Sequence, residues 1–341
     1  MIAILAQLLT AALAAAAAAP PAHAVVVEGR KATASATSQL AHKDPKRYAA
    51  ANAFDGDPST AWVEGVPGLG KGEALTLRFD QPTAIEGVLI VAGYAKSGKT
   101  LTDNGVPTKV LLALDGKPAL PIQLYFARRG PVDPDKDATC RISGDSINLA
   151  PRLIVLPARS EPVRELTIRI DQAEQVGRFD ETAISELLPI VEGGKLSVGG
   201  RSYAAAAQAL IALRQRQGAA LPIAEGANVE TLLPFPDKVE SLHAGEKFEA
   251  FITERGAASA PDAQEAWVVA LGPELLGKAV VAEVRGDGLH LVGPLAFTHG
   301  DGEWLELFPT MDLDAKGKIS GLGRAFHTDG APGCREVLPA R

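Results

Sequence analysis

The sequence predicts a mainly β protein, with a β-sandwich in its first half and a smaller α+β domain with an antiparallel sheet in its second. Three observations predict this. Short apolar segments rich in Val, Ile and Leu alternate with Gly, Pro, Asp and Asn, as in strands separated by turns. The 341 residues include 34 Gly and 24 Pro, a composition that favours turns over long helices. No strong amphipathic helix interrupts the first half, so its strands are expected to pair with one another.

The expected strands of the first half are four to eight residues long and bounded by turn residues. They are 74–79, 85–91, 110–114, 120–126, 153–156, 166–170 and 183–190. Seven or eight short strands at such spacing are typical of a sandwich.

The second half begins after a flexible Gly-rich stretch at residues 192–195, which we interpret as the domain boundary. Residues 203–217 are rich in Ala, Leu, Gln and Arg and stop at Gly218, which predicts a helix. Arg285 to Gly288 (RGDG) indicates a hairpin turn. The strands expected here are 247–253, 266–271, 279–285, 289–292, 304–308 and 319–326. The predicted division is therefore a leader at 1–24, a sandwich at 25–192 and an α+β domain at 193–341.

The first 24 residues predict export. An apolar run from Ile2 to Ala19 is followed by two prolines and then by Ala22-His23-Ala24, the small-x-small pattern that signal peptidase needs. We expect cleavage after Ala24 and a secreted or periplasmic protein. The alternative is an uncleaved anchor, because the run approaches the ~20 residues that span a bilayer. No segment after residue 25 is apolar for long enough to span, so we expect no stable membrane span once the leader is removed.

Charge and motifs disfavour several function classes. A net charge of -7 argues against the clustered basic surface that binds nucleic acid, so we expect the protein not to bind nucleic acid. No nucleophile elbow, HExxH helix or CxxC pair is present. Residues 299–303 and 312–319 contain carboxylates between strands, and both are expected to be turns. Cys140 and Cys334 could pair in an oxidising compartment or remain buried thiols.

Residues 93–100 (GYAKSGKT) match the phosphate-binding loop G-x-x-x-x-G-K-[ST] letter for letter. Such a loop requires a helix that begins at its Lys, here Lys99, and directs its N-terminal dipole at the phosphates. Asn104-Gly105 marks a turn and Pro107 opposes a longer helix, so we expect no helix at Lys99. The sequence therefore predicts a polar loop between two strands and no nucleotide binding, despite the Gly93–Thr100 match.

The segment from Asn52 to Trp62 (NAFDGDPSTAW) contains several candidate metal ligands close together. Two carboxylates, a glycine and a threonine hydroxyl lie within six residues, and calcium prefers such hard oxygen ligands. The alternative is an Asp-Gly turn made rigid by Pro58, with Trp62 as a core anchor. The residues alone leave both interpretations open.

This segment resembles the A-x-N-x-x-D-G-D-x-x-T-x-W signature of galactose-binding-like sandwiches, the discoidin or coagulation-factor type C group. It is most similar to the NADase-type glycan-binding domain, in which the signature continues through W-V-E-G-V-P-G. The further blocks here are Trp62 to Gly68, the Gly93 to Ser97 loop, Asn104, and Asp180 to Glu186. The resemblance covers about residues 27–191 and does not imply NAD cleavage.

The resemblance implies a jelly-roll sandwich in which the 55–60 loop meets the last strand around a structural calcium ion. The implied metal ligands are Asp55, Asp57, Thr60 and Glu186. The implied sugar contacts are Trp62, Glu64, Tyr94, Lys96 and Asn104, although Trp62 is also a candidate for the core.

The function expected from these observations is an exported glycan-binding protein whose partner is a glycan or glycoconjugate. One alternative is a secreted or periplasmic enzyme that acts on a glycan, with its chemistry in the second half. Another is an envelope protein with a structural or protein-binding role.

Overall fold

The computed structural model describes residues 19–124, 151–175, 177–215, 223–228, 280–292, 297–300, 304–328 and 335–336. Most of the predicted leader, both cysteines and the expected strands 247–253 and 266–271 lie outside the described residues. Within the described part, no helix is long and apolar enough to cross a membrane.

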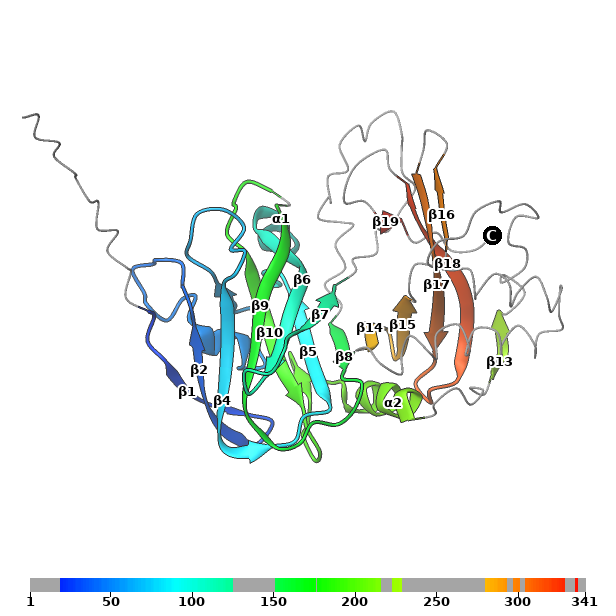
Figure 1. The fold of residues 1–341 in the computed structure, drawn as a ribbon, viewed down its shortest axis with the longest axis horizontal. Coiled ribbons are helices and arrows are strands. Elements are labelled where there is room, and N and C mark those ends of the chain that lie inside the picture. The colour runs from blue at the N-terminus through cyan, green and yellow to red at the C-terminus, as the bar shows by residue number, and fades with distance from the viewer. Residues whose placement is uncertain are drawn as a thin grey trace, which may run out of the picture.

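Two sheets build the first half (Figure 1). The first sheet has six antiparallel strands in the spatial order β1 (His23–Val27), β2 (Arg30–Ala36), β4 (Ala74–Thr83), β9 (Val163–Gln175), β6 (Gly105–Leu114) and β7 (Leu120–Gln123). The second sheet runs β8 (Arg152–Val155), β5 (Gly87–Ala92), β10 (Ala183–Ile190) and β3 (Trp62–Val63) on this side of the molecule. The predicted cleavage point after Ala24 lies within β1.

The second sheet continues into the second half. Beyond β8 it adds β14 (Val280–Arg285), β15 (Gly288–Val292), β17 (Trp304–Leu313), β18 (Ile319–Thr328) and β13 (Ile223–Asn228). The strand β16 (Phe297–Gly300) pairs with β17, and β19 (Arg335–Glu336) pairs with β18. Among these pairings only β13 and β18 are parallel. A small hairpin, β11 (Ser197–Val198) with β12 (Arg201–Ser202), precedes the helix α2 (Ala204–Gln215).

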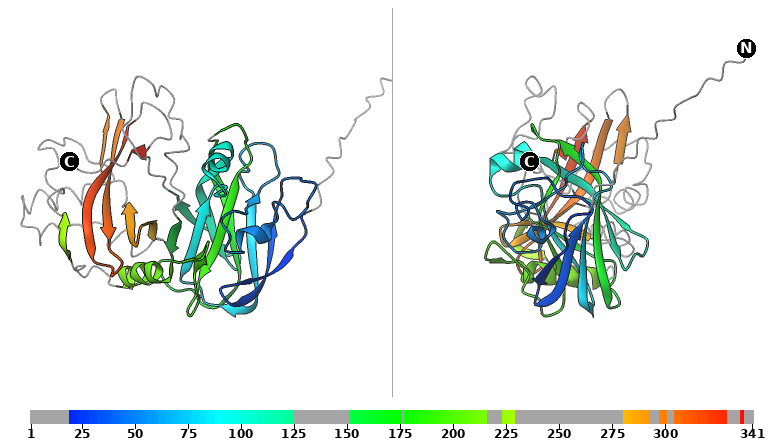
Figure 2. Two further views of the ribbon diagram at one scale, coloured as in Figure 1. Left: turned by 180° about the vertical axis from the view of Figure 1, so that it is seen from behind. Right: turned by 90° about the vertical axis from the view of Figure 1, so that its left-hand side faces the viewer.

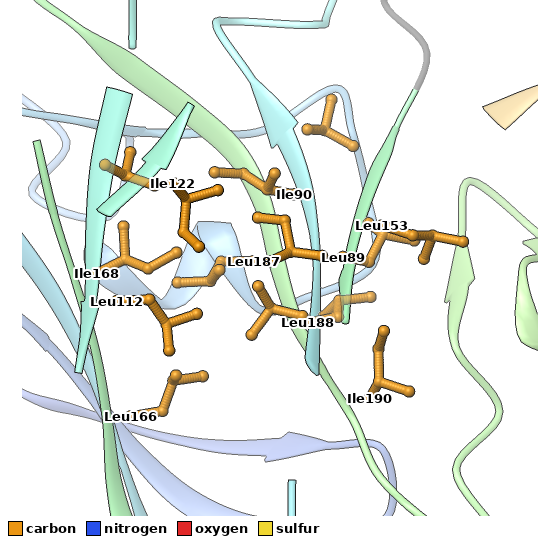
Figure 3. Packing of buried hydrophobic residues seen from close by; sticks show 14 of the residues in the cluster. Leu89, Ile90, Leu112, Ile122, Leu153, Leu166, Ile168, Leu187, Leu188 and Ile190 are labelled. Atoms are coloured by element: carbon orange, nitrogen blue, oxygen red, sulfur yellow. The ribbon is translucent and has the colours of Figure 1, made fainter. Parts of the chain in front are cut away.

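The core of the sandwich lies between the two sheets. Side chains from both sheets, including Leu112, Ile168 and Leu89, pack together there (Figure 3). All eight residues of β10 are buried, so this strand is covered on both faces. Each fully buried Leu or Ile contributes about 1.5–3 kcal/mol through removal of apolar surface from water, which makes this cluster the main source of stability.

Strand directions place several loops at one end of the sandwich. The strand β6 begins at this end, and its antiparallel partner β9 finishes there. The start of β4 and the end of β2 follow by the same register. The short helix α1 (Gly98–Asp103) lies at this end of the sandwich, which we therefore call the α1 end. The loops at the α1 end are 37–48, 64–73, 93–104 and 177–182. Figure 2 shows the sandwich from two further directions.

The junction of the two halves is a strand pairing rather than a linker. Four residues of β14 pair with β8, from Val280 opposite Val155 to Glu283 opposite Arg152. Arg152 and Glu283 are both buried, with their charged atoms 3.7 Å apart. The helix α2 packs against β8 and β14, and its Arg214 donates to Glu86 at 2.7 Å. The second sheet therefore crosses the predicted boundary at residues 192–193, and the domain division stays a prediction.

The predicted fold class is confirmed: the chain is mainly β, with antiparallel sheets and few helices. The expected helix at 203–217 is present as α2, and the RGDG hairpin joins β14 to β15. The segment around Asp314 is a turn, as expected, with Gly317 donating to the Asp314 carbonyl at 2.9 Å.

The expectation of no helix at Lys99 is wrong. The helix α1 runs from Gly98 to Asp103, because Ser97 and Thr100 form a reciprocal capping box that satisfies its first N–H groups. It ends at Asn104, which is extended, so the turn signal shortened the helix without preventing it.

Candidate functional site

The loop that carries Asp55 to Thr60 meets the last strand of the sandwich, as predicted. The Gly56 N–H donates to Glu186 Oε2 at 3.2 Å. Gly56 has a φ of +77°, a conformation that glycine adopts without strain and that aims its N–H at the strand. The short 3-10 helix η1 (Ala50–Ala53) leads into this loop and contacts β10. Two segments 130 residues apart are thus joined at one carboxylate.

Glu186 is a buried carboxyl group beside a second one. Its side chain is 0% exposed, and within the described residues its Oε1 atom has no hydrogen-bond partner. Burial, together with the neighbouring Asp55 carboxylate, raises the pKa of Glu186 to about 9. Burial also raises the pKa of Asp55. Glu186 is thus a buried carboxyl group beside the more exposed carboxyl of Asp55, an arrangement that a shared proton or a bound cation would stabilise.

The predicted metal ligands Asp57 and Thr60 are engaged within the loop. Asp57 is exposed, and its Oδ1 accepts the Ser59 N–H at 2.9 Å. Hydrogen bonds from the side chain and then the backbone of Ser59 lower the pKa of Asp57. The Thr60 hydroxyl donates to Asp55 Oδ2 at 2.9 Å. Among the described residues, no group of three or more His, Cys, Asp or Glu side chains is arranged to hold a metal ion. The oxygens gathered at Asp55 and Glu186 nevertheless suit calcium, which also accepts carbonyl and hydroxyl ligands.

Two of the predicted sugar contacts lie inside the protein. Trp62 is 0% exposed, packs in the main core and donates its indole N–H to the Ser38 carbonyl at 2.9 Å. Glu64 is also 0% exposed and accepts the N–H groups of Thr182 at 3.0 Å and Val66 at 2.8 Å. Burial raises the pKa of Glu64. The prediction that these two side chains contact a ligand is corrected here: they fix the loops of the α1 end from within.

The other three predicted contacts lie at the α1 end. Tyr94 is 5% exposed and therefore almost fully buried. Lys96 is exposed in the loop before α1. Asn104 is half-buried, and its Nδ2 donates to the Thr100 carbonyl at 2.5 Å. Lys96 and Asn104 remain predicted ligand contacts.

Next to Tyr94 the structure assembles aromatic and basic side chains that the sequence did not single out. Tyr48 stacks edge-to-face on Tyr94 with ring centroids 6.3 Å apart, and His42 stacks in the same way on Tyr48 at 5.7 Å. The guanidinium of Arg47 lies 5.7 Å from the Tyr48 ring centroid. We call His42, Arg47, Tyr48, Tyr94 and Lys96 the aromatic–basic patch. His42 is exposed and Tyr48 half-buried, so the rings have both support and accessible surface.

The signature residue Asn52 holds this patch in place. Its Nδ2 group lies within hydrogen-bond distance of the carbonyls of Lys46, Arg47 and Ala61, at 3.1, 2.9 and 3.2 Å. Asp44 also accepts the Lys46 N–H at 2.9 Å, which closes the loop on itself. The run of His, Lys and Arg from 42 to 47 reads as a solvent-exposed loop in the sequence, and only the Asn52 contacts show that it is fixed.

The residues of the phosphate-loop match are engaged with one another. The Thr100 hydroxyl donates to the Tyr94 carbonyl at 3.0 Å and also takes part in the Ser97 cap. The Lys99 ammonium pairs with Asp103, one turn along α1. The absence of nucleotide binding stays a prediction.

Residues 27–188 match the family described as the NAD glycohydrolase translocation F5/8 type C domain. The match lies in the N-terminal half of the chain. The matched segment begins in β1 and ends in β10, so it includes both Asp55 and Glu186. No curated protein matches the chain.

Solved structures resemble the same half. A mycobacterial arabinofuranosyltransferase AftD is 15% identical with a TM-score of 0.31, and the match covers 50% of this chain but only 11% of that one. Chitosan-binding module 1 of a chitosanase/glucanase from Paenibacillus sp. IK-5 is 11% identical with a TM-score of 0.28, covering 49% of this chain and 98% of the module. An F5/8 type C domain from Bacteroides fragilis is 14% identical with a TM-score of 0.31, covering 49% and 95%.

Proposed function

We propose that this chain is an exported glycan-binding protein, and that the aromatic–basic patch at the α1 end of its F5/8 type C domain contacts the sugar. The observation that carries the proposal is the stack of His42, Tyr48 and Tyr94, with the Arg47 guanidinium against the Tyr48 ring. The match of residues 27–188 to the F5/8 type C domain family supports it. The leader-like segment before Ala24 supports export.

The patch has the chemistry that a pyranose requires. The apolar face of a sugar ring packs on an aromatic ring, and its hydroxyls accept or donate hydrogen bonds at the rim. Tyr48 presents the accessible ring, because Tyr94 is almost buried beneath it. Asn52 fixes the loop before any ligand arrives, which reduces the entropy lost on binding.

A glycan array probed with the full chain tests this proposal. We expect wild-type protein to bind a subset of glycans, and Tyr48→Ala to weaken that binding at least about tenfold, equivalent to 1.4 kcal/mol. Phe179→Ala is the matched control, because Phe179 is an exposed aromatic ring at the same end but outside the patch. Absence of binding to every glycan, or equal losses in the two variants, would contradict the proposal.

We also propose that calcium binds between the 55–60 loop and Glu186. The buried, unpartnered Oε1 of Glu186 beside Asp55 supports this, because a cation would replace the proton that this pair otherwise holds. Asp55 and Glu186 would supply charged oxygens, with Asp57 and Thr60 as the further predicted ligands. Calcium would supply positive charge that ties the loop to the last strand; it would take no part in sugar chemistry.

Thermal unfolding with and without calcium tests the ion site. We expect calcium to raise Tm over that in chelator, and Glu186→Gln to abolish the difference, because binding to the folded state alone stabilises it. Glu161→Gln removes an exposed carboxylate elsewhere and serves as the control. An equal Tm with calcium and with chelator would refute the ion site and leave the glycan proposal standing.

A further inference from the structure

Cations outnumber carboxylates in the two loops that carry the aromatic–basic patch. The 42–48 loop carries exposed Lys43, Lys46 and Arg47, and exposed Lys96 follows Tyr94 two residues along the chain. The one carboxylate of the loop is Asp44, which already accepts the Lys46 N–H. The whole chain has a net charge of -7, so this local excess of positive charge is opposite in sign to the molecule.

Arg47 is the most defined of these cations. Its guanidinium lies against the Tyr48 ring, and hydrogen bonding to Tyr48 raises its pKa further. Within the described part of the chain Arg47 forms no ion pair, whereas Arg214 and Arg159 are each paired with Glu86. An arginine held by an aromatic ring and lacking a carboxylate partner presents a planar fork of donors, which matches a carboxylate or sulfate.

We propose that the ligand of this site is an acidic glycan, whose sugar carries a carboxylate or sulfate group. This rests on the proposed function. The ring faces of His42 and Tyr48 would take the sugar, and Arg47 would take its acidic group, with Lys96 and Lys46 adding longer-range attraction. A neutral sugar would gain nothing from this charge.

The test uses one array that holds neutral, carboxylated and sulfated glycans, probed with the full chain at about 0.05 and 0.5 M NaCl. We expect the strongest binding to carboxylated or sulfated glycans and a loss of at least tenfold at the higher salt. Arg47→Gln should reduce acidic-glycan binding by about tenfold or more while leaving Tm unchanged. The separate carboxylated and sulfated arms identify which group is recognised.

Lys117→Gln is the matched control, because Lys117 is exposed in the turn after β6, at the opposite end of the sandwich. It removes the same charge and should leave binding unchanged. Preferred binding of neutral glycans, or acidic binding that is insensitive to salt and to Arg47→Gln, would overturn the acidic-ligand inference while the proposed function stands. Absence of binding to all three classes would overturn both.

Discussion

Trp62 is a core residue that supports the α1 end from within the sandwich. Its side chain is fully buried, and its indole N–H fixes the start of the 38–48 loop through the Ser38 carbonyl. We expect Trp62→Ala to lower the free energy of unfolding by about 3–5 kcal/mol, as large-to-small core changes do. Denaturant unfolding measures this loss.

Trp62→Phe separates a core role from a contact role. It should cost less stability than Trp62→Ala and leave the glycan affinity of the folded protein within about twofold, a change of roughly 0.4 kcal/mol. A loss of affinity at unchanged stability would show instead that the indole contacts sugar.

The sequence identified the segment around Trp62 but not which side chains face solvent. Exposure depends on what tertiary structure places over a residue, and here the 38–40 backbone covers β3, with Leu40 N–H donating to the Val63 carbonyl at 2.9 Å. The same limit explains why Tyr48 and Arg47 were missed. Tyr48 stacks on Tyr94, which lies 46 residues further along the chain, and this long-range contact is what defines the site. Arg47 contacts Tyr48, its direct neighbour in sequence, and that contact alone would not indicate a site.

Glu186 gives the calcium-free protein a characteristic pH dependence. Its pKa is raised to about 9 in the folded state, above its ordinary value of 4.5. A raised folded-state pKa contributes stability that is fully present below pH 4.5 and is lost as pH rises through about 9. In chelator, we therefore expect wild-type Tm to fall between pH 5 and 9 more steeply than that of Glu186→Gln.

Calcium should cancel this slope, because the cation rather than a proton then balances the carboxylate. Scanning calorimetry of both proteins across that pH range, with calcium and with chelator, measures the effect. Parallel pH profiles for wild type and Glu186→Gln in chelator would show that the buried carboxyl does not titrate as described.

At the scale of elements, α1 shows how local capping overrides a breaker signal. Asn104, Gly105 and Pro107 were sufficient to end the helix, but the reciprocal Ser97–Thr100 bonds were sufficient to start it. In this short helix the Thr100 N–H already donates to the Ser97 hydroxyl, and Lys99 already pairs with Asp103. Few free donors are therefore left to bind a phosphate.

We therefore expect no nucleotide to bind at the phosphate-loop match of residues 93–100. We expect millimolar ATP with magnesium to leave Tm unchanged, since a ligand bound to the folded state raises it by RT ln(1 + [L]/Kd). Differential scanning fluorimetry measures this. A Tm increase that Lys99→Ala removes would mean that the loop does bind nucleotide.

The strand predictions succeeded where apolar residues are continuous and failed where they are not. β5 and β10 were expected almost to the residue because both faces are buried. β1 and β2 were missed: β1 lies at the edge of its sheet next to a leader-like segment, and β2 is built from small and polar residues. β1 pairs with β2, and β2 in turn pairs with β4, which lies far along the chain.

At the scale of the whole molecule, the two halves share one sheet and one core. Residues after the predicted boundary, including Leu196, Val198 and Leu210, belong to the same buried cluster as the sandwich. A Gly-rich stretch marks a turn in the sequence, but it cannot show that the chain returns to pair β14 with β8.

Truncation tests this continuity. We expect a fragment of residues 25–192 to have a lower Tm than the full chain, because it exposes the edge of β8 and the apolar surface that α2 covers. Thermal unfolding and light scattering of both proteins measure the difference. An equally stable, monomeric fragment would show that the sandwich is independent and that the predicted division holds.

The central claim is that a sugar occupies the aromatic–basic patch at the α1 end. A crystal structure of the full chain with the oligosaccharide that binds tightest on the array tests it most directly. The account predicts a pyranose packed on Tyr48 and His42, with Arg47 bonded to its polar or acidic groups. A sugar bound on the second-half sheet, or at the opposite end of the sandwich, would contradict it.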